Sequence, residues 1–364
     1  MIQECGEWHM EFLSTRQVSA KWNITQRQVI ELCLEGRVPG AQKVDTHWIV
    51  PEDAEKPEDG RSLRYCGTTA KIKPFLKWAG GKGQLLPEIR KIYPEELGRS
   101  ITKYAEPFVG GGAVLLDLLG SCQLEEVYIS DSNAELVNAY GVIRDRPDDL
   151  SERLYRMQEA YLALDMEGRK EYYYAVRDRF NQLKTGGGGA LPRAADMIFL
   201  NRTCFNGLYR VNKKGLFNVP MGAYRNPQIL DADNLALLSG ALRRVRIVHG
   251  DYRRAEEFID DRTFAYFDPP YRPLTRTSAF TSYTENAFGD EEQRRLAEFV
   301  LHLAREKGAR VAASNSDPHN ADPADDFFEE IYDGCVLRRI DATRMINANT
   351  GGRGKIKELL ITTW

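Results

Sequence analysis

Four consecutive residues, Asp268, Pro269, Pro270 and Tyr271, have the clearest chemical meaning in this sequence. They directly follow the apolar run TFAYF, which has the composition of a buried strand. Two prolines after a strand end hold the loop extended and remove backbone donors, so a carboxylate and a carbonyl remain as acceptors. With the tyrosine ring beside them, these acceptors suit a flat ring that carries an exocyclic amino group. The segment predicts a catalytic or binding loop for such a ring.

A second segment, EPFVGGG, places Gly110, Gly111 and Gly112 between an apolar run and a helical one. Glycines at such a turn let a ligand approach the backbone N–H groups at the start of a helix. The segment is not a dinucleotide fingerprint, because Leu115 stands where the third glycine of G-x-G-x-x-G would be. The next apolar run ends at Asp131, a position where ribose hydroxyls are commonly bound. Capping of the following helix is the alternative role for this acid.

The run FLKWAGGK supplies Trp78 and Lys82 ahead of these segments. It is not a phosphate-binding P-loop, because Gly83 follows the lysine where a serine or threonine would bind magnesium. Trp78 can instead cover an adenine or a sulfonium group, and Lys82 can pair with a carboxylate.

Apolar strands that alternate with helical stretches must position these residues. The strand-like runs are KYAEP, EVYIS, VRIVHG, TFAYFD and ARVAAS, and the helical ones are AVLLDLLG, NAELVNAYGVI, AEEFI and EQRRLAEFVLHLAREKG. This alternation predicts an α/β fold with an open, doubly wound, mostly parallel sheet over residues 73–145 and 246–364. Such sheets bind ligands at the carboxyl ends of their strands.

Residues 146–245 interrupt that alternation with long amphipathic stretches and a glycine-rich loop at 185–189. They predict an inserted, mainly helical subdomain, which carries a basic hairpin around Lys213 to Gly215.

Residues 1–55 have the pattern of a small separate domain, and residues 56–72 have the composition of a linker. Ser14 and Thr25 can each cap a short helix, and two extended runs follow on either side of residues 45–46. The pattern resembles winged helix-turn-helix domains, in which the second helix would carry Gln26, Arg27 and Gln28 at its start. A role in packing or protein docking is the alternative.

Composition limits the class of protein. The chain has 364 residues, and its net charge of −3 does not by itself indicate a nucleic-acid partner. The charge is segregated, however: residues 60–87 and 197–230 contain no acid, which suits an anionic ligand on one face. No apolar run is long enough to span a membrane and the N-terminal segment is charged, which predicts a cytoplasmic protein. The six cysteines show no C-x-x-C spacing, so neither a disulfide framework nor a metal site is expected.

Several motifs occur in the order used by Dam-type DNA adenine-N6 methyltransferases of the alpha group. They are FLKWAGGK, EPFVGGG, SDSN, GDY and DPPY. The segment NRTCFNGLYRVNKKGLFNVPMG, the runs FTSYTENAF and SNSD, and the closing GGRGKIKELLITTW also resemble this family, so the resemblance extends from Pro74 to the end. It implies a Rossmann-like methyltransferase sheet with an inserted target-recognition subdomain. The implied enzyme is a site-specific adenine methyltransferase that acts on duplex DNA with S-adenosyl-L-methionine as methyl donor.

The resemblance also implies where the donor and the target adenine lie. The adenine would be flipped out of the duplex and stack on Tyr271, with its N6 donating to the Asp268 carboxylate and the Pro269 carbonyl. The residues that would surround S-adenosyl-L-methionine are Trp78, Lys82, Phe108, Gly110, Gly111, Gly112, Asp131, Asp251 and Tyr252.

The basic hairpin resembles the family's reader of GATC. Arg210 would contact a guanine, and Leu208 would contact a thymine methyl group. Lys213 and Lys214 would meet phosphates, and Phe205 would wedge into the base stack. The full predicted DNA-binding set is Phe205, Asn206, Leu208, Arg210, Lys213, Lys214, Tyr224 and Arg27.

Three other functions agree less well with these motifs. Cytosine-C5 methylation needs a nucleophilic cysteine, usually after proline, and no cysteine here follows a proline. Cytosine-N4 methylation uses a similar geometry but often has serine before Pro-Pro-Tyr, so Asp268 favours adenine without proving it. A DNA-binding regulator with an inactive methyltransferase-like domain is a further alternative. We expect a monomer, with a cognate restriction enzyme as a candidate partner.

Overall fold

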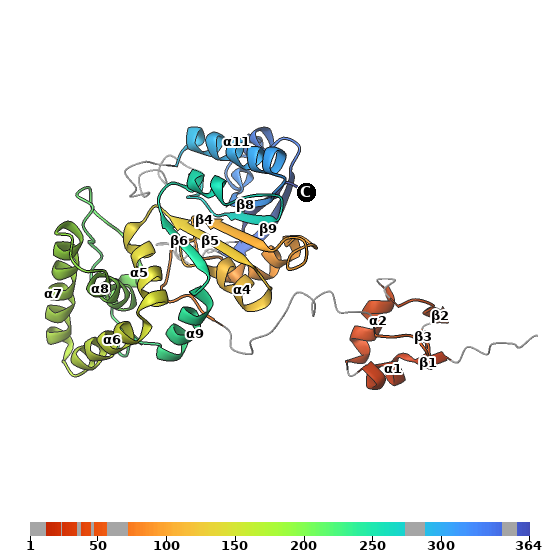
Figure 1. Ribbon diagram of the computed structural model, residues 1–364, viewed down its shortest axis with the longest axis horizontal. Coiled ribbons are helices and arrows are strands. Elements are labelled where there is room, and N and C mark those ends of the chain that lie inside the picture. The colour runs from red at the N-terminus through yellow and green to blue at the C-terminus, as the bar shows by residue number, and fades with distance from the viewer. Residues whose placement is uncertain are drawn as a thin grey trace, which may run out of the picture. The chain divides into compact units, whose positions relative to one another are not determined.

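The computed structural model describes residues 12–22, 24–34, 38–44, 47–56, 72–273, 288–343 and 355–364. The chain divides into two compact units, Met1–Tyr65 and Cys66–Trp364 (Figure 1). Most of the predicted linker, and all but the last residue of FTSYTENAF, lie outside the described residues.

The smaller unit combines two helices with a three-stranded antiparallel sheet. Its elements are β1 (Phe12–Ser14), α1 (Thr15–Trp22), α2 (Gln26–Leu34), β2 (Gln42–Val44) and β3 (His47–Pro51), and the strand order is β1-β3-β2. Ser14 and Thr25 begin the two helices as predicted, because each hydroxyl accepts from the backbone N–H three residues later, at 3.3 Å. Arg27 is exposed at the start of α2. Strand β1 was not predicted, and it extends the expected β2–β3 hairpin to three strands.

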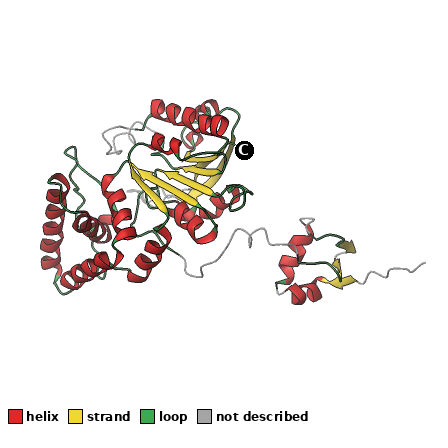
Figure 2. Ribbon diagram, in the orientation of Figure 1, coloured by secondary structure: helices red, strands yellow, loops and turns green. Residues whose placement is uncertain are grey.

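The larger unit is built on a seven-stranded sheet with the order β6-β5-β4-β7-β8-β10-β9 (Figure 2). Its strands are β4 (Lys103–Pro107), β5 (Glu126–Asp131), β6 (Val245–His249), β7 (Thr263–Phe267), β8 (Arg310–Ser316), β9 (Val336–Thr343) and β10 (Lys355–Thr362). Strands β4 to β8 pair in parallel, whereas β10 runs antiparallel to both β8 and β9. The mostly parallel sheet and its first five strands are therefore confirmed, and the antiparallel pair β9–β10 was not predicted.

Helices cover both faces of this sheet. They are α3 (Leu86–Ile89), α4 (Ala113–Ser121), α5 (Ala134–Asp145), α6 (Pro147–Leu162), α7 (Met166–Thr185), α8 (Ala190–Thr203), α9 (Ala232–Leu242), α11 (Asp290–Lys307) and α12 (Phe327–Ile331). Short 3₁₀ turns are η1 (Lys82–Gln84), η2 (Arg90–Ile92), η3 (Phe205–Gly207), η4 (Tyr252–Glu257) and η5 (Pro318–Asn320). The run AEEFI, expected to be helical, overlaps η4 and continues as irregular chain.

Alternate residues of each strand face different helical layers. In β7, Phe264 and Tyr266 face the core that includes α4, α5 and the helices of residues 147–242, while Ala265 and Phe267 face the core that includes α11. These two layers lie on opposite sides of the sheet in Figure 1. Helices α6 to α9 thus share one apolar core with a face of the sheet.

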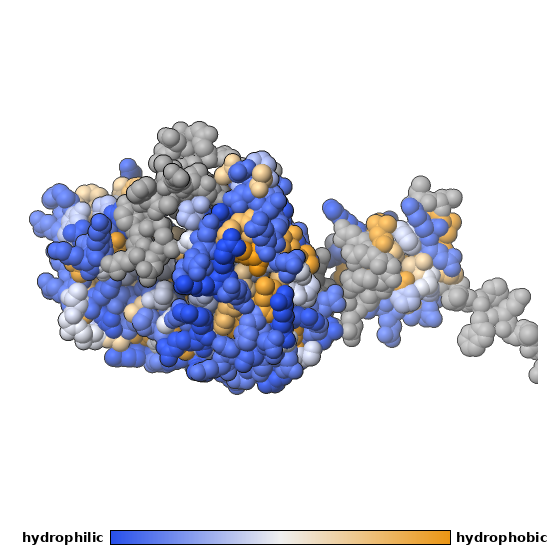
Figure 3. Space-filling model, turned by 90° about the horizontal axis from the view of Figure 1, so that it is seen from above, coloured by the Kyte–Doolittle hydropathy of each residue, from blue (hydrophilic) through white to orange (hydrophobic). Residues whose placement is uncertain are grey.

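The surface of the larger unit differs in composition from these cores. Hydrophilic residues cover most of the face drawn in Figure 3, and apolar residues form small patches there. In the ranges that the structure describes, no helix has both the length and the apolar character that crossing a membrane requires.

Candidate active site

The predicted site segments meet at one edge of the sheet. Strands β4, β5, β6 and β7 are parallel, so their carboxyl ends lie together. The glycine turn follows β4, Asp131 ends β5, Asp251 follows β6 and Asp268 follows β7. Two backbone N–H groups join these segments directly, because Gly250 donates to the Asp131 carbonyl oxygen and Gly110 to the Asp131 carboxylate, both at 3.1 Å.

Asp268 is held by donors from two other parts of the chain. Its Oδ1 accepts from Lys82 Nζ at 2.7 Å and from the Ser314 hydroxyl at 2.8 Å. The Ser314 hydroxyl accepts in turn from the Tyr266 hydroxyl at 3.1 Å. Both of these contacts from described residues go to Oδ1, so Oδ2 is the oxygen that an incoming amino group could use.

Lys82 lies beside both Asp268 and Tyr271. Its Nζ also donates to the Gly80 carbonyl at 2.7 Å and is 4.7 Å from the centroid of the Tyr271 ring. The Tyr271 hydroxyl donates to Glu358 at 2.5 Å, and burial raises the pKa of Tyr271, which keeps this hydroxyl protonated. The sequence predicted that Lys82 covers the methyl donor and can pair with a carboxylate. In this structure Lys82 pairs with the carboxylate of Asp268.

Glu106, at the end of β4, is a buried carboxyl group within electrostatic reach of Asp268 and Lys82. Its Oε2 accepts from the Tyr104 hydroxyl at 2.7 Å. Burial and the negative charge of Asp268 raise the pKa of Glu106 to about 8, although hydrogen bonds from Tyr104 and Leu115 and the charge of Lys82 oppose the shift. At neutral pH this carboxyl group is therefore mostly protonated.

Replacing Glu106 with glutamine is expected to make the free energy of unfolding less dependent on pH. The native carboxyl group keeps its proton up to a pH of about 8, whereas an unfolded chain releases it above about 4.5. The wild-type free energy of unfolding should therefore fall as the pH rises through this range, and Glu106→Gln should lack that part of the slope. Urea unfolding at several pH values measures the difference, with exposed Glu95→Gln as control. Identical slopes for wild type and Glu106→Gln would contradict the raised pKa.

The turn after β4 requires glycine for two reasons. Gly110 and Gly112 have φ angles of 48° and 68°. A Cβ atom at Gly110 would come within 2.9 Å of Trp78, and one at Gly112 within 2.5 Å of the Tyr140 hydroxyl. With Gly111 between them, these residues form a closely packed turn that Trp78 and Tyr140 support.

Asp131 binds the glycine turn. Its carboxylate accepts from the N–H groups of Gly110 at 3.1 Å and Asn133 at 2.8 Å. Desolvation raises the pKa of Asp131, and these N–H groups oppose the shift. The cap of α5 is Asn133, whose Oδ1 accepts from the N–H groups of Glu135 and Leu136 at 3.1 Å. Side-chain capping of α5, offered above as the alternative role of Asp131, is thus performed by Asn133.

Phe108 and Tyr252 form an aromatic pair beside this turn. Phe108 has a φ angle of 72°, in the left-handed region that bulky residues rarely adopt. Its ring stacks on Tyr252 with 5.3 Å between centroids. The preceding Asp251 is partly exposed and pairs with Arg253 at 2.7 Å, and this contact lowers the pKa of Asp251. The backbone strain at Phe108 persists only where the surroundings enforce it, and such strain often marks a functional position.

The FLKWAGGK segment is attached to the basic hairpin. The Trp78 ring stacks on Tyr209 with 5.5 Å between centroids. The buried Asn201 side chain bonds to the N–H and carbonyl groups of Lys77, both at 2.9 Å, and to the Gly207 carbonyl at 2.8 Å. Trp78, which packs on the glycine turn, and the base of the hairpin therefore belong to one packed assembly.

The predicted DNA-binding residues of the hairpin differ in exposure. Arg210 Nε donates to Asn218 Oδ1 at 2.8 Å, and Leu208 packs partly against the main core. Tyr224 is half-buried, and its hydroxyl accepts from Lys77 Nζ at 3.4 Å. The exposed members of the set in this region are Phe205, Asn206, Lys213 and Lys214.

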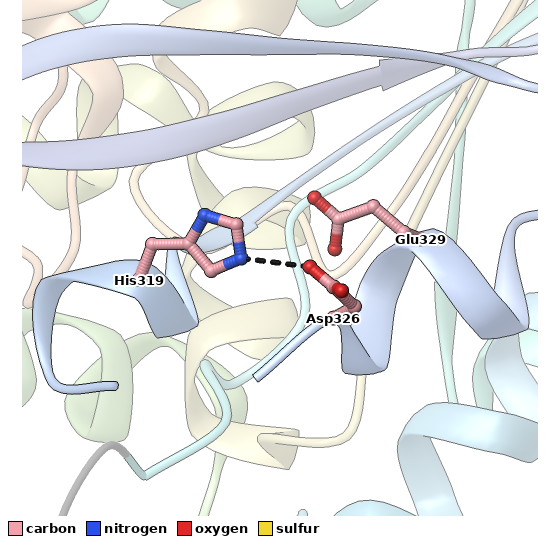
Figure 4. A group of neighbouring side chains, drawn as sticks. All are labelled: His319, Asp326 and Glu329. Carbon is pink, nitrogen blue, oxygen red and sulfur yellow. Dashed lines mark hydrogen bonds and ion pairs between the residues drawn. The ribbon is translucent and has the colours of Figure 1, made fainter. Parts of the chain in front are cut away.

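A cluster of three side chains outside this site has the composition of a metal centre. In the described part of the chain, His319, Asp326 and Glu329 place their ligand atoms within 4.8 Å of one another (Figure 4). Arg339 donates to His319 Nδ1 at 3.0 Å, pairs with Glu329 and bonds to Asp317 at 3.1 Å. Because Nδ1 accepts this bond, the proton of a neutral imidazole lies on Nε2, which faces Asp326 at 3.0 Å. The guanidinium therefore supplies the positive charge of the cluster, which ties β9 to η5 and α12.

Sequence reasoning named Lys82 as a partner for a carboxylate without assigning it to Asp268, and it gave no role to the other groups around this loop. Ser314 belonged to a motif but had no role assigned, and Glu106 and Glu358 were not singled out. One signal was available, namely the acid Glu106 inside the predicted strand KYAEP. A polar side chain in a buried strand requires a partner, and Tyr104 supplies it for Glu106.

Comparison with known proteins assigns a family to this arrangement. A model described as D12 class N6 adenine-specific DNA methyltransferase matches residues 78–346. The chain is 48% identical to the Type II methyltransferase M.MjaIII of Methanocaldococcus jannaschii, over 80% of this chain and 99% of that protein. It is 39% identical to the Type II methyltransferase M1.LlaDCHI of Lactococcus lactis subsp. cremoris, over 80% and 96% of the two chains. It is also 34% identical to the DNA adenine methylase of Haemophilus influenzae, over 80% and 93%. As the order of its motifs predicted, the chain belongs to the D12 class of N6 adenine-specific DNA methyltransferases.

Proposed function

We propose that this enzyme transfers a methyl group from S-adenosyl-L-methionine to N6 of the adenine in GATC within duplex DNA. The arrangement at Asp268 carries the proposal. The Lys82 ammonium group lies 2.7 Å from the Asp268 carboxylate and 4.7 Å from the centre of the Tyr271 ring, so an N–H donor here meets both a carboxylate and an aromatic face. A flipped adenine offers the same pair of features, an amino group on a flat ring.

The residues that follow or end β4, β5 and β6 fit S-adenosyl-L-methionine. The stacked pair of Phe108 and Tyr252 offers an apolar wall for an adenine ring. Each Asp131 oxygen accepts one backbone N–H, and a carboxylate oxygen can accept a further bond from a ribose hydroxyl. When bound, S-adenosyl-L-methionine supplies a methyl group on a positively charged sulfur.

The residues of this chain act by orientation and electrostatics. Adenine N6 is a weak nucleophile, because its lone pair is delocalised into the ring. The Asp268 carboxylate and the Pro269 carbonyl each accept a hydrogen bond from one of the two N6–H groups. These hydrogen bonds favour the geometry in which the lone pair leaves conjugation and positive charge grows on nitrogen. Tyr271 holds the ring by stacking, and Asp268 is the nearest acceptor for the proton that N6 then loses.

The proposed recognition site rests on the hairpin of residues 206–220, which resembles the GATC reader of Dam-type enzymes. Arg210 and Leu208 are assigned to base edges, and Lys213 and Lys214 to phosphates. The enzyme is proposed to act as a monomer in the cytoplasm. A restriction enzyme of the same specificity is the proposed partner, since two relatives are named Type II methyltransferases.

Methylation-sensitive sequencing of DNA from cells that express the chain tests base, position and site together. We expect N6-methyladenine at GATC, and none in cells that express Asp268→Ala. N6-methyladenine in another sequence would contradict the assigned site, and N4-methylcytosine would contradict the assigned base.

The smaller unit is proposed to be a winged helix-turn-helix that binds DNA but does not contribute to the chemistry. Deleting residues 1–55 should leave methylation of the correct site in place, because every proposed catalytic and donor-binding residue lies after Lys73. Affinity for DNA should fall by about 10-fold through the loss of phosphate contacts, or the distribution of methylated genomic sites should change. Binding and turnover assays on short duplexes measure the DNA affinity and the activity of the truncated protein. Arg27→Ala in the full chain is the matched variant. A truncated protein that folds but is inactive on short duplexes would show that the unit helps to build the active site.

A further inference from the structure

Two buried amide side chains connect the catalytic loop to α11 and β8. Gln293 on α11 is fully buried, and Asn315 on β8 is 3% exposed. Gln293 Nε2 donates to the Pro270 carbonyl at 3.0 Å, and its Oε1 accepts from Asn315 Nδ2 at 3.0 Å. Asn315 Oδ1 accepts from the backbone N–H of Arg272 at 3.0 Å. This series of hydrogen bonds begins at the carbonyl before Tyr271 and ends at the N–H after it.

The sequence of the loop explains why it needs such support. Neither proline has an N–H group, so between Asp268 and Tyr271 the backbone offers only carbonyl oxygens by which it can be held. A buried amide that lacks partners is costly, whereas a satisfied network of amides specifies one arrangement. Gln293 and Asn315 satisfy each other while each also binds the loop, so a shift of the loop would break their contacts.

The geometry has a consequence for the two groups that face the target base. With the Pro270 carbonyl directed to Gln293, the Pro269 carbonyl is the remaining proline acceptor for an amino group. The ring of Tyr271 is held at both ends, by this pair at the backbone and by Glu358 at its hydroxyl. Ser316 also holds the backbone after Tyr271, because its hydroxyl donates to the Arg272 carbonyl at 2.9 Å.

We propose that Gln293 and Asn315 are positioning residues that hold the Pro269 carbonyl and the Tyr271 ring in the orientation required for methyl transfer. The proposal rests on the assignment of the Asp268 loop as the catalytic loop. It differs from a purely structural role because the pair should affect the rate of transfer more than the binding of either substrate. A misplacement of about 1 Å can cost about 100-fold in rate.

Gln293→Met tests this proposal, since methionine has a similar length but cannot donate to the Pro270 carbonyl. We expect kcat to fall by about 10- to 100-fold, with little change in the KM for S-adenosyl-L-methionine or in DNA affinity. Glu298→Met, an exposed position on the same helix, is the control and should keep wild-type kcat. Asn315→Asp is the second variant, because it retains the acceptor for the Arg272 N–H but loses the donor to Gln293. Its kcat should lie between those of wild type and Gln293→Met.

The outcomes separate this proposal from the catalytic assignment on which it rests. Wild-type kcat in a folded Gln293→Met protein would overturn the proposal. A change in KM with unchanged kcat would also overturn it, as would an equal decrease of kcat in Glu298→Met. If Gln293→Met does not fold, Asn315→Asp decides, since wild-type kcat in that variant would overturn the proposal and reduced kcat would support it. Asp268→Asn is assayed in parallel. An active Asp268→Asn would contradict the catalytic assignment, whereas an inactive one beside a fully active Gln293→Met would contradict only the positioning role.

Discussion

Asp268→Ala is expected to lower the rate of methyl transfer by about 10²- to 10³-fold while S-adenosyl-L-methionine binding survives. The carboxylate is proposed to accept from the target amino group, and removal of one group placed against developing charge costs about 10² to 10³ in turnover. The proposed donor residues Phe108 and Asp131 lie at the ends of other strands, β4 and β5. Single-turnover assays and calorimetric titration with S-adenosyl-L-methionine measure the two effects separately.

Two further variants separate charge from folding in this experiment. Alanine leaves the buried Lys82 ammonium group without its partner, and an unpaired buried charge costs about 3–5 kcal/mol of stability. Asp268→Asn keeps an oxygen for Ser314 but loses the charge and replaces the second acceptor oxygen with an NH2 group, so it should be inactive with a smaller change in Tm. Exposed Asp333→Ala is the control and should match wild type. Parallel loss of donor binding and turnover would show that the DPPY loop lies against the donor rather than the base.

Arg210→Ala is expected to relax recognition at one base pair of the site. A bidentate arginine–guanine contact contributes about 1–3 kcal/mol of discrimination. In this structure the guanidinium is held within the hairpin by Asn218, through Oδ1 at 2.8 Å and the carbonyl at 3.3 Å. Such prior ordering reduces the side-chain entropy lost on binding DNA. Turnover on a set of duplexes with one substituted base pair each measures the change in preference.

Lys213→Ala is the matched control for this prediction. Lys213 is exposed at the turn of the hairpin, and its proposed contact is a phosphate. Its replacement should weaken binding on every sequence alike and reduce the slope of log affinity against log salt by about 1. If Arg210→Ala also lowered activity on every duplex equally, the hairpin would position DNA without reading it.

Local patterns identified most of the fold, for reasons that particular elements illustrate. Strands β4, β5 and β7 are short apolar runs bounded by turns, and α11 has the spacing of an amphipathic helix, so periodicity was sufficient for them. Strands β9 and β10 were not predicted. Their sequences are VLRRIDAT and KIKELLIT, in which charged residues weaken the apolar signal, and their pairing joins segments separated by residues outside the described ranges. Their assignment as strands depends on the pairing of β10 with β8 and of β9 with β10, which no local pattern contains.

Contiguous motifs alone predicted that the glycine turn and the carboxylate of the DPPY loop belong to the active site at the carboxyl edge of the sheet. The partners of that carboxylate could be identified only from the tertiary structure. Lys82 comes before β4 in the chain, whereas Ser314 and Glu358 belong to β8 and β10, which follow the loop. All three side chains nevertheless lie around the loop. The protonation of Glu106 likewise depends on its burial near Asp268. A motif is a property of neighbouring residues and can be recognised in the chain itself. Ion pairs, desolvation and the Gln293–Asn315 contact arise between distant segments, so only the packing of the folded chain determines them.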